Sequence, residues 1–244
     1  MINATKKKSL PIVAIGASSG GLEAVSALLR ELPPNLGMAF IYVQHLSPDH
    51  KSLLTSILSK VTMMKVQEIE EMETILPNNV YIIPNDKGIE VTDGHIKLLP
   101  RSKGGKPISI DVLFSSLAET HKENVIGIVL SGNGSDGTEG LKAIKEAGGI
   151  TFAQNNSAQV SSMPKTSIAS GAVDFVLSPK EIARKLTLLY KGGFLSRIIK
   201  RKLEENLFDA NDPDLKVVLE ILEFIPIKFI MHTSLLISNC VIHR

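Results

Sequence analysis

Short apolar runs alternate with segments whose apolar residues recur at helical spacing, and this alternation constrains the fold more than any other feature of the chain. Buried strands of a parallel sheet are short, nearly continuous apolar runs, because helices cover both of their faces. Such runs occupy residues 12–15, 38–43, 125–130, 150–153 and 172–177. Apolar residues recur at helical spacing in segments 21–32, 110–121, 138–147 and 178–190. We therefore predict an α/β fold with a doubly wound, mostly parallel, Rossmann-like sheet and helices on both faces.

Residues 80–99 depart from this alternation. The stretch "VYIIPNDKGIEVTDGHIKLL" consists of short alternating runs separated by Asn-Asp-Lys-Gly and Asp-Gly. These are hairpin turn sequences, because Asn, Asp and Gly tolerate the backbone angles of tight turns. We predict antiparallel hairpins inserted into the α/β frame. Two further helices are expected, one starting at Ser47-Pro48-Asp49 with proline near its first turn and a short one after the loop at residues 154–162.

The regular pattern ends near Tyr190, and the remainder of the chain differs in character. We predict a disordered N-terminus, one domain, a charged linker and a tail with a short helix, over residues 1–9, 10–190, 191–214 and 215–244. The last part of the tail is apolar, but Lys228 and His232 interrupt any run long enough to span a bilayer.

Charge and cysteine content narrow the function classes. The 27 basic residues are balanced by 25 acidic ones, and no basic stripe is interleaved with aromatic residues, so nucleic acid is not expected as a partner. The single Cys240 excludes an internal disulfide framework and fits a reducing compartment. The basic start of the chain leads into a strand and a glycine turn rather than a signal-peptide core. We predict a cytoplasmic protein that does not insert into the membrane.

Three side chains with catalytic potential follow the ends of three predicted strands. Ser18 is the central residue of Gly16-Ala17-Ser18-Ser19-Gly20, a G-x-S-x-G sequence between a strand and a helix. His45 comes directly after the second strand, and Asp136 lies in a loop of small residues after the third. Because loops at the carboxyl ends of parallel strands converge on one crevice, these positions are where a ligand would bind.

Serine, histidine and aspartate together suit nucleophilic catalysis. A hydroxyl is a poor nucleophile until an imidazole takes its proton, and a carboxylate fixes the imidazole tautomer and stabilises its charged form. We therefore predict Ser18 as nucleophile, His45 as base and Asp136 as the carboxylate. Backbone N–H groups after Ser18, that of Ser19 among them, would form an oxyanion hole, with a further donor from the glycine-rich loop at residues 132–137.

Each of these residues has a second interpretation when it is taken alone. The glycine turn is equally suited to an anion or to tight packing, although neither G-x-G-x-x-G nor G-x-x-x-x-G-K-[ST] is present. His45 alone could be a packed histidine, and Asp136 alone a helix N-cap. No Cys or His pair has metal-ligand spacing, so no metal site is expected.

The sequence resembles the catalytic domain of the CheB family of chemotaxis protein-glutamate methylesterases. The motifs that carry the resemblance, in chain order, are "AIGASSGG", "QHLSP", "YIIPND", "SIDVLFSSLA", "LSGNGSDGTEGLKAIKEAGG", "AQNNSAQVSSMP" and "GAVDFVLSP". The resemblance covers residues 11–190 and implies the same three roles for Ser18, His45 and Asp136. It implies hydrolysis of glutamyl methyl esters on chemoreceptor helices, with deamidation of receptor glutamines and without a cofactor.

One departure from the family pattern concerns the oxyanion. Family members commonly carry Met where this chain has Asn133, so Asn133 and its neighbour Gly134 are predicted to support the oxyanion through the backbone. Met163 and Pro164, with the loop before them, are expected to line a shallow, open crevice. The departure leaves an alternative function, a catalytically degenerate module that docks on a receptor or kinase.

A second departure concerns what flanks the domain. Only about ten residues precede the first strand, whereas the typical family member begins with a receiver domain. The arrangement resembles the start of fusions between CheB and the CheR methyltransferase, which makes a CheR-type enzyme a candidate partner. Residues 215–244 would then be the truncated or frame-shifted start of a methyltransferase part.

Overall fold

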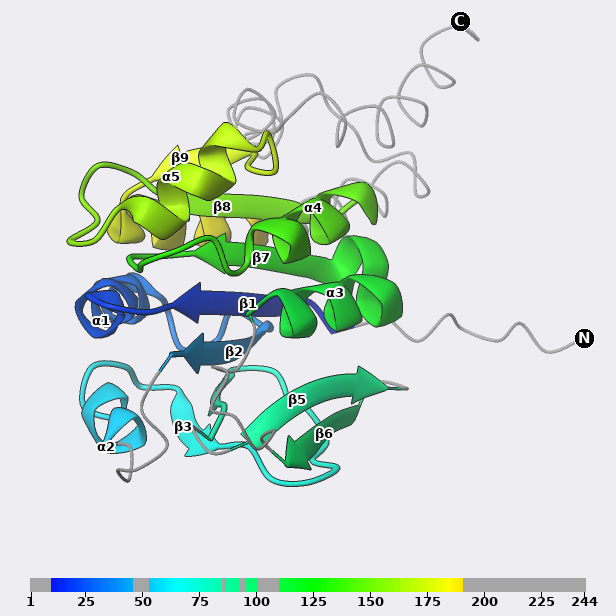
Figure 1. Cartoon of the computed structure of the whole chain (residues 1–244). Helices are drawn as coiled ribbons and strands as arrows, with labels where there is room; N and C mark the ends of the chain where they lie inside the picture. The colour runs from blue at the N-terminus through cyan, green and yellow to red at the C-terminus, as the bar shows by residue number, and fades with distance from the viewer. Residues whose placement is uncertain (1–9, 46–52, 85–86, 93–94, 101–109, 191–244) are drawn as a thin grey trace, which may run out of the picture. The chain divides into compact units, whose positions relative to one another are not determined.

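A seven-stranded sheet forms the centre of the computed structural model, which describes residues 10–45, 53–84, 87–92, 95–100 and 110–190. Its strands are β1 (Ile12–Ala17), β2 (Ala39–Gln44), β3 (Lys65–Glu68), β4 (Asn79–Ile82), β7 (Val125–Val129), β8 (Ile150–Gln154) and β9 (Phe175–Leu177). Their order across the sheet is β3-β4-β2-β1-β7-β8-β9, and every neighbouring pair is parallel. Figure 1 shows β1 in the middle, with β2 on one side and β7 on the other.

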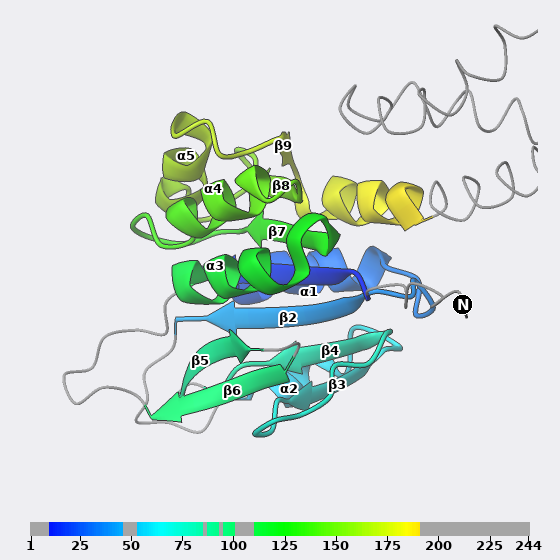
Figure 2. The same ribbon diagram turned by 90° about the vertical axis from the view of Figure 1, so that its right-hand side faces the viewer.

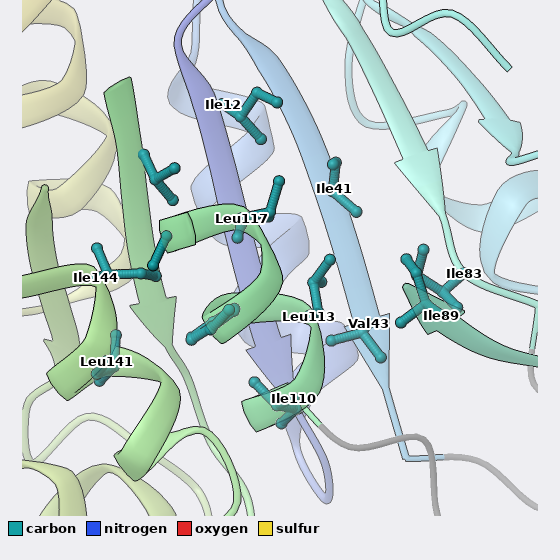
Figure 3. Close-up of a cluster of buried hydrophobic side chains, with 14 of the residues drawn as sticks. Ile12, Ile41, Val43, Ile83, Ile89, Ile110, Leu113, Leu117, Leu141 and Ile144 are labelled. Carbon is teal, nitrogen blue, oxygen red and sulfur yellow. The ribbon is translucent and has the colours of Figure 1, made fainter. Parts of the chain in front are cut away.

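Helices connect the strands and cover both faces of the sheet. They are α1 (Gly21–Glu31), α2 (Leu54–Leu58), α3 (Ile110–His121), the short 3-10 helix η1 (Lys122–Asn124), α4 (Thr138–Glu146) and α5 (Ser162–Ala169), and residues 179–190 are also helical. Figure 3 shows α3 and α4 on one face of the sheet and α1 behind it. The predicted α/β fold with a doubly wound sheet is therefore confirmed.

The core beneath α3 follows the two periodicities of the sequence. Alternate residues of the central strands, among them Ile12 and Ile41, face α3, which presents Ile110, Leu113 and Leu117 from successive turns (Figure 3). All five side chains are buried. Burial of a side chain of this size stabilises the fold by roughly 1.5–3 kcal/mol, so this layer holds the start of α3 firmly against β1.

The N-terminal ends of α3 and α4 approach each other closely. A Cβ atom at Gly140 would lie 2.5 Å from the Cβ of Phe114 and 3.1 Å from the Cα of Asp111. Only glycine therefore permits this contact between the first turns of the two helices. The contact brings the loop before α4 beside the start of α3, and that loop contains Asp136.

Residues 79–100 differ in part from the prediction. Val80 to Ile82 belong to β4, which pairs in parallel with both β2 and β3, so the prediction of antiparallel pairing from Val80 onward is wrong. The predicted hairpin itself is confirmed as β5 (Lys87–Thr92) and β6 (His95–Pro100), which are antiparallel. It lies at the β4 side of the sheet in both views and contacts α3 (Figures 1 and 2).

One strand escaped the sequence analysis altogether. β3 has the sequence Lys-Val-Gln-Glu and forms an edge of the sheet, with its first and last residues exposed. Edge strands commonly carry charged residues, which discourage pairing with other chains. A strand with a single apolar residue has no periodicity for sequence analysis to detect.

The chain divides into two units, Met1–Lys185 and Leu186–Arg244, and the strands all belong to the first. The predicted helix start at Ser47, the N-terminus at residues 1–9 and the segments 191–214 and 215–244 lie outside the described residues. Their predicted boundaries remain predictions. In the part of the chain that the structure describes, no helix is long and apolar enough to cross a membrane.

Candidate active site

Ser18, His45 and Asp136 follow three strands that are neighbours in the sheet. Ser18 comes directly after β1, His45 directly after β2, and Asp136 lies in the loop between β7 and α4. The chain goes from β1 to one half of the sheet and returns to the other half at β7, which places the topological switch point between β1 and β7. A ligand crevice is expected there, because the loops on either side diverge. The three residues thus follow the carboxyl ends of three adjacent parallel strands.

The turn that carries Ser18 depends on its glycines. Gly20 has φ +74°, a left-handed conformation that side chains rarely adopt, and precedes α1 as its N-cap. The Ser18 N–H donates to the Ser131 carbonyl at 2.9 Å, and the Ser18 carbonyl accepts the Gly21 N–H at 2.9 Å. The turn is therefore tight and bonded on both sides, and Ser18 at its tip is half-buried.

His45 and Asp136 form a close pair. The distance from His45 Nε2 to Asp136 Oδ2 is 2.7 Å, and the two side chains are 17% and 22% exposed. With Asp136 ionised, Nε2–H donates to the carboxylate and leaves Nδ1 as the imidazole's acceptor. No hydrogen bond joins the Ser18 hydroxyl to His45 within the described residues. Catalytic contacts of this kind often tighten only when substrate binds.

The Asp136 carboxylate also accepts three backbone N–H groups. Oδ2 accepts from Ile110 at 2.8 Å, and Oδ1 accepts from Asp111 at 3.1 Å and from Gly137 at 3.0 Å. Burial raises the pKa of Asp136, but the hydrogen bonds from His45 and from the α3 backbone outweigh it and hold the pKa well below its usual value. Asp136 is therefore ionised at neutral pH and fixes the tautomer of His45.

Asp111, in the first turn of α3, is a site neighbour that the sequence analysis missed. Its Oδ1 accepts the Gly140 N–H at 2.7 Å, so Asp111 caps the start of α4 while Asp136 caps the start of α3. Burial raises the pKa of Asp111, and the charge of Asp136 raises it further. Its partner Gly140 lies 29 residues further along the chain, so no local sequence signal could have identified this residue.

The predicted oxyanion residues have different surroundings. Ser19 is exposed, and neither its N–H nor that of Gly20 has an acceptor among the described residues, so both are available to an anion. The Gly134 N–H donates weakly to the Ser162 hydroxyl at 3.3 Å, and Asn133 is exposed. The backbone after Ser18 is thus the better equipped donor, as it is at nucleophile turns in general.

Met163 and Pro164, which are predicted to line the crevice, are both buried. Met163 is fully buried in the core, and a Cβ atom at Gly132 would lie 2.8 Å from its Cε and 2.9 Å from the Cβ of Ser18. Met163 therefore packs against the loop beside Ser18. Across the described part of the chain, no group of three His, Cys, Asp or Glu side chains could hold a metal ion.

Comparison with known proteins gives a consistent result. The family model described as CheB methylesterase matches residues 13–186. The chain is 35% identical over 193 residues to the protein-glutamate methylesterase/protein-glutamine glutaminase of Yersinia pestis and 34% identical to the proteins of that name from Pectobacterium atrosepticum and Salmonella typhimurium. Each match covers 77% of this chain and 55% of the relative, so the chain spans about half the length of these curated relatives.

A solved structure resembles the fold. The crystal structure of the Thermotoga maritima CheB methylesterase catalytic domain aligns with a TM-score of 0.68 and 31% sequence identity. The alignment covers 74% of this chain and 99% of that domain. The likeness therefore spans one complete catalytic domain.

Proposed function

The chain belongs to the CheB methylesterase family, and from that premise we propose that it hydrolyses methyl esters of glutamate side chains on chemoreceptors and releases methanol. The observation that carries the proposal is the placement of Ser18, His45 and Asp136 after three adjacent strands, with His45 held 2.7 Å from Asp136. Such a constellation converts a serine hydroxyl into a nucleophile for acyl transfer. The amide of a receptor glutamine is a second substrate of the same chemistry, with ammonia as the leaving group.

The first half of the reaction is acylation of Ser18. Nδ1 of His45 takes the hydroxyl proton while Nε2–H remains bonded to Asp136, and the Ser18 oxygen attacks the ester carbonyl. The ionised Asp136 stabilises the imidazolium that forms. The N–H groups of Ser19 and Gly20 donate hydrogen bonds to the oxyanion of the tetrahedral intermediate. They lie at the start of α1, where the helix dipole favours an anion.

The second half releases the products. The His45 imidazolium gives its proton to the methoxide oxygen, so methanol leaves and Ser18 carries the glutamyl acyl group. Water then enters, gives a proton to His45 and attacks the acyl carbon. As the second intermediate collapses, the His45 imidazolium returns that proton to the Ser18 oxygen, and the glutamic acid product loses its own proton to water. Every step uses groups of the chain, the substrate and water.

The substrate and partners derive from the same premise. We propose the cytoplasmic helices of methyl-accepting receptors as protein substrate, because relatives that share this domain are named for their action on protein glutamate and glutamine. A glutamyl methyl ester must first be made by a methyltransferase, and a CheR-type enzyme is the partner that supplies it. The half-buried position of Ser18 suits a side chain presented on the surface of another protein.

Methanol release from methylated receptor tests the proposal. We expect Ser18→Ala to lower the rate by several orders of magnitude, because the nucleophile is removed. Ser116→Ala is the matched control. Within the described part of the chain, the Ser116 hydroxyl donates to the Leu113 carbonyl of its own helix α3, at 3.0 Å, and makes no other hydrogen bond. Wild-type protein that releases no methanol, yet binds receptor, would instead support the alternative of a docking module.

A further inference from the structure

Ser131 is a fully buried polar residue next to the nucleophile turn, and the acyl-transfer chemistry does not use its hydroxyl. It comes after β7 and has no exposed surface. Its Oγ donates to the Ser19 carbonyl at 2.7 Å and accepts the Val160 N–H at 2.9 Å. The hydroxyl of Ser131, in the loop after β7, thus bonds both the turn after β1 and the loop before α5. Three loops meet at this one side chain.

The backbone of Ser131 holds the same turn from a second direction. Its carbonyl accepts the Ser18 N–H at 2.9 Å, while its N–H donates to the buried Gln154 Oε1 at 2.9 Å. The bonds from Ser131 therefore reach the peptide units on either side of the Ser18–Ser19 peptide. Gln154, at the end of β8, anchors Ser131 itself to the sheet.

Peptide planarity transmits these bonds to the oxyanion donors. In a trans peptide the C=O and the following N–H point in opposite directions, so a fixed carbonyl also fixes the next N–H. The hydrogen bond from the Ser131 hydroxyl to the Ser19 carbonyl therefore fixes the direction of the Gly20 N–H. In the same way, the hydrogen bond from the Gly21 N–H to the Ser18 carbonyl fixes the direction of the Ser19 N–H. Neither of these two N–H groups has an acceptor among the residues described.

The packing leaves no slack between Ser131 and the turn. A Cβ atom built at Gly20 would lie 2.6 Å from the Ser131 Oγ, a distance that real Cβ contacts essentially never show. The Ser131 hydroxyl therefore lies directly against the turn, beside Gln159 Oε1, which would be at the same distance from that Cβ.

We propose that Ser131 is a positioning residue of the reaction, whose buried hydroxyl aligns the N–H donors after Ser18 with the oxyanion. Ser131 acts through the Ser19 carbonyl and touches neither the substrate nor the reacting atoms. The inference rests on the proposed acyl transfer at Ser18, but it does not depend on which ester is the substrate.

Labelling of Ser18 by a fluorophosphonate measures this alignment without receptor. Phosphonylation passes through an oxyanion at the same donors, so Ser131→Ala is expected to slow labelling roughly ten- to a hundredfold. Ser131→Thr, which restores the hydroxyl, should recover most of the rate. Ser167→Ala is the control, because Ser167 is equally buried and its hydroxyl bonds Met163 O at 3.1 Å and Thr138 Oγ1 at 3.0 Å, away from the turn.

Stability is followed in parallel by urea denaturation, so that loss of fold is not taken for loss of alignment. Ser131→Cys fills similar space with a weak donor and serves where the alanine variant does not fold; slowed labelling is expected there too. Labelling of folded Ser131→Ala, or of Ser131→Cys where the alanine variant does not fold, at the rate of Ser167→Ala would overturn the inference. Normal methanol release by the wild-type protein with that result would leave the proposed function intact. Slowed labelling of Ser131→Ala, combined with a wild-type protein that releases no methanol, would support the role of Ser131 and reject the methylesterase.

Discussion

Asp136 accepts the imidazole N–H of His45 through Oδ2 at 2.7 Å, while its Oδ1 accepts the backbone N–H of Asp111 at 3.1 Å. One carboxylate therefore joins the end of β2 to the start of α3, two places far apart in the sequence. Since Nε2 of His45 faces Asp136, the base in the proposed reaction is Nδ1. This arrangement and its neighbours support four predictions.

Asp136→Asn should lower kcat/KM for methanol release by roughly a thousandfold or more, because the amide no longer holds the His45 tautomer. Asp174→Asn is a matched control: its carboxylate also accepts a backbone N–H, that of Thr151 at 3.0 Å, but it lies beside β9. A drop of less than tenfold in Asp136→Asn, or an equal drop in the control, would remove Asp136 from its role.

The stability that Asp136 contributes should depend on pH. Its pKa is lowered in the folded state from an ordinary value of 3.8, so its contribution is complete above that value and is lost as pH falls through the folded pKa. We expect Asp136→Asn to lower the free energy of unfolding by about 1–3 kcal/mol at neutral pH. Urea denaturation should show this difference shrinking below pH about 4. A difference that stays constant down to pH about 2 would contradict the assignment.

Asp111 should show the opposite sign. Burial, and then the charge of Asp136, raise its pKa in the folded state above 3.8, so its ionisation reduces stability as pH rises between the ordinary and the raised value. Asp111→Asn keeps an acceptor for the Gly140 N–H and should gain stability relative to wild type as pH rises from about 3 to about 7.

The comparison variant Asp111→Ala loses the acceptor for Gly140. It should be less stable by roughly 1 kcal/mol, the usual effect of removing a helix cap. If Asp111→Asn instead loses stability relative to wild type as pH rises over the same range, the pKa of Asp111 is not raised in the folded state.

Gly20→Ala should abolish labelling of Ser18 and lower stability more than Gly171→Ala does. Both glycines have φ +74°, but a Cβ at Gly171 meets nothing within 4 Å, whereas one at Gly20 would lie 2.6 Å from Ser131 Oγ. Gly171→Ala thus isolates the backbone strain, about 1–2 kcal/mol. Circular dichroism melts and labelling rates of both variants measure the difference. Equal stability and normal labelling would contradict the tight turn.

The local character of each element was open to prediction from the sequence. Periodicity reports which residues of a segment are buried, so the central strands and the helices after them were recognisable from their apolar patterns. The same patterns marked where strands end, and hence picked out Ser18, His45 and Asp136. The resemblance to CheB methylesterases, which the family match bears out, pointed to the same three residues.

Only the tertiary structure decided which segments lie together. A short run such as Val80–Ile82 can form part of a hairpin or of a parallel sheet. Here it pairs with β2 and β3, and that choice depends on long-range pairing. Likewise, nothing local to Met163 says that it is buried beneath Gly132.

The site shows the same division. Position at a strand end identified its three principal side chains, but the contacts that orient them cross large sequence separations: 91 residues from His45 to Asp136, and 112 from Ser131 to Ser19. Asp111 and Ser131 are ordinary polar residues until the fold buries them against particular backbone groups. A buried polar atom must find a partner, and which partner it finds is set by the packing of the whole domain.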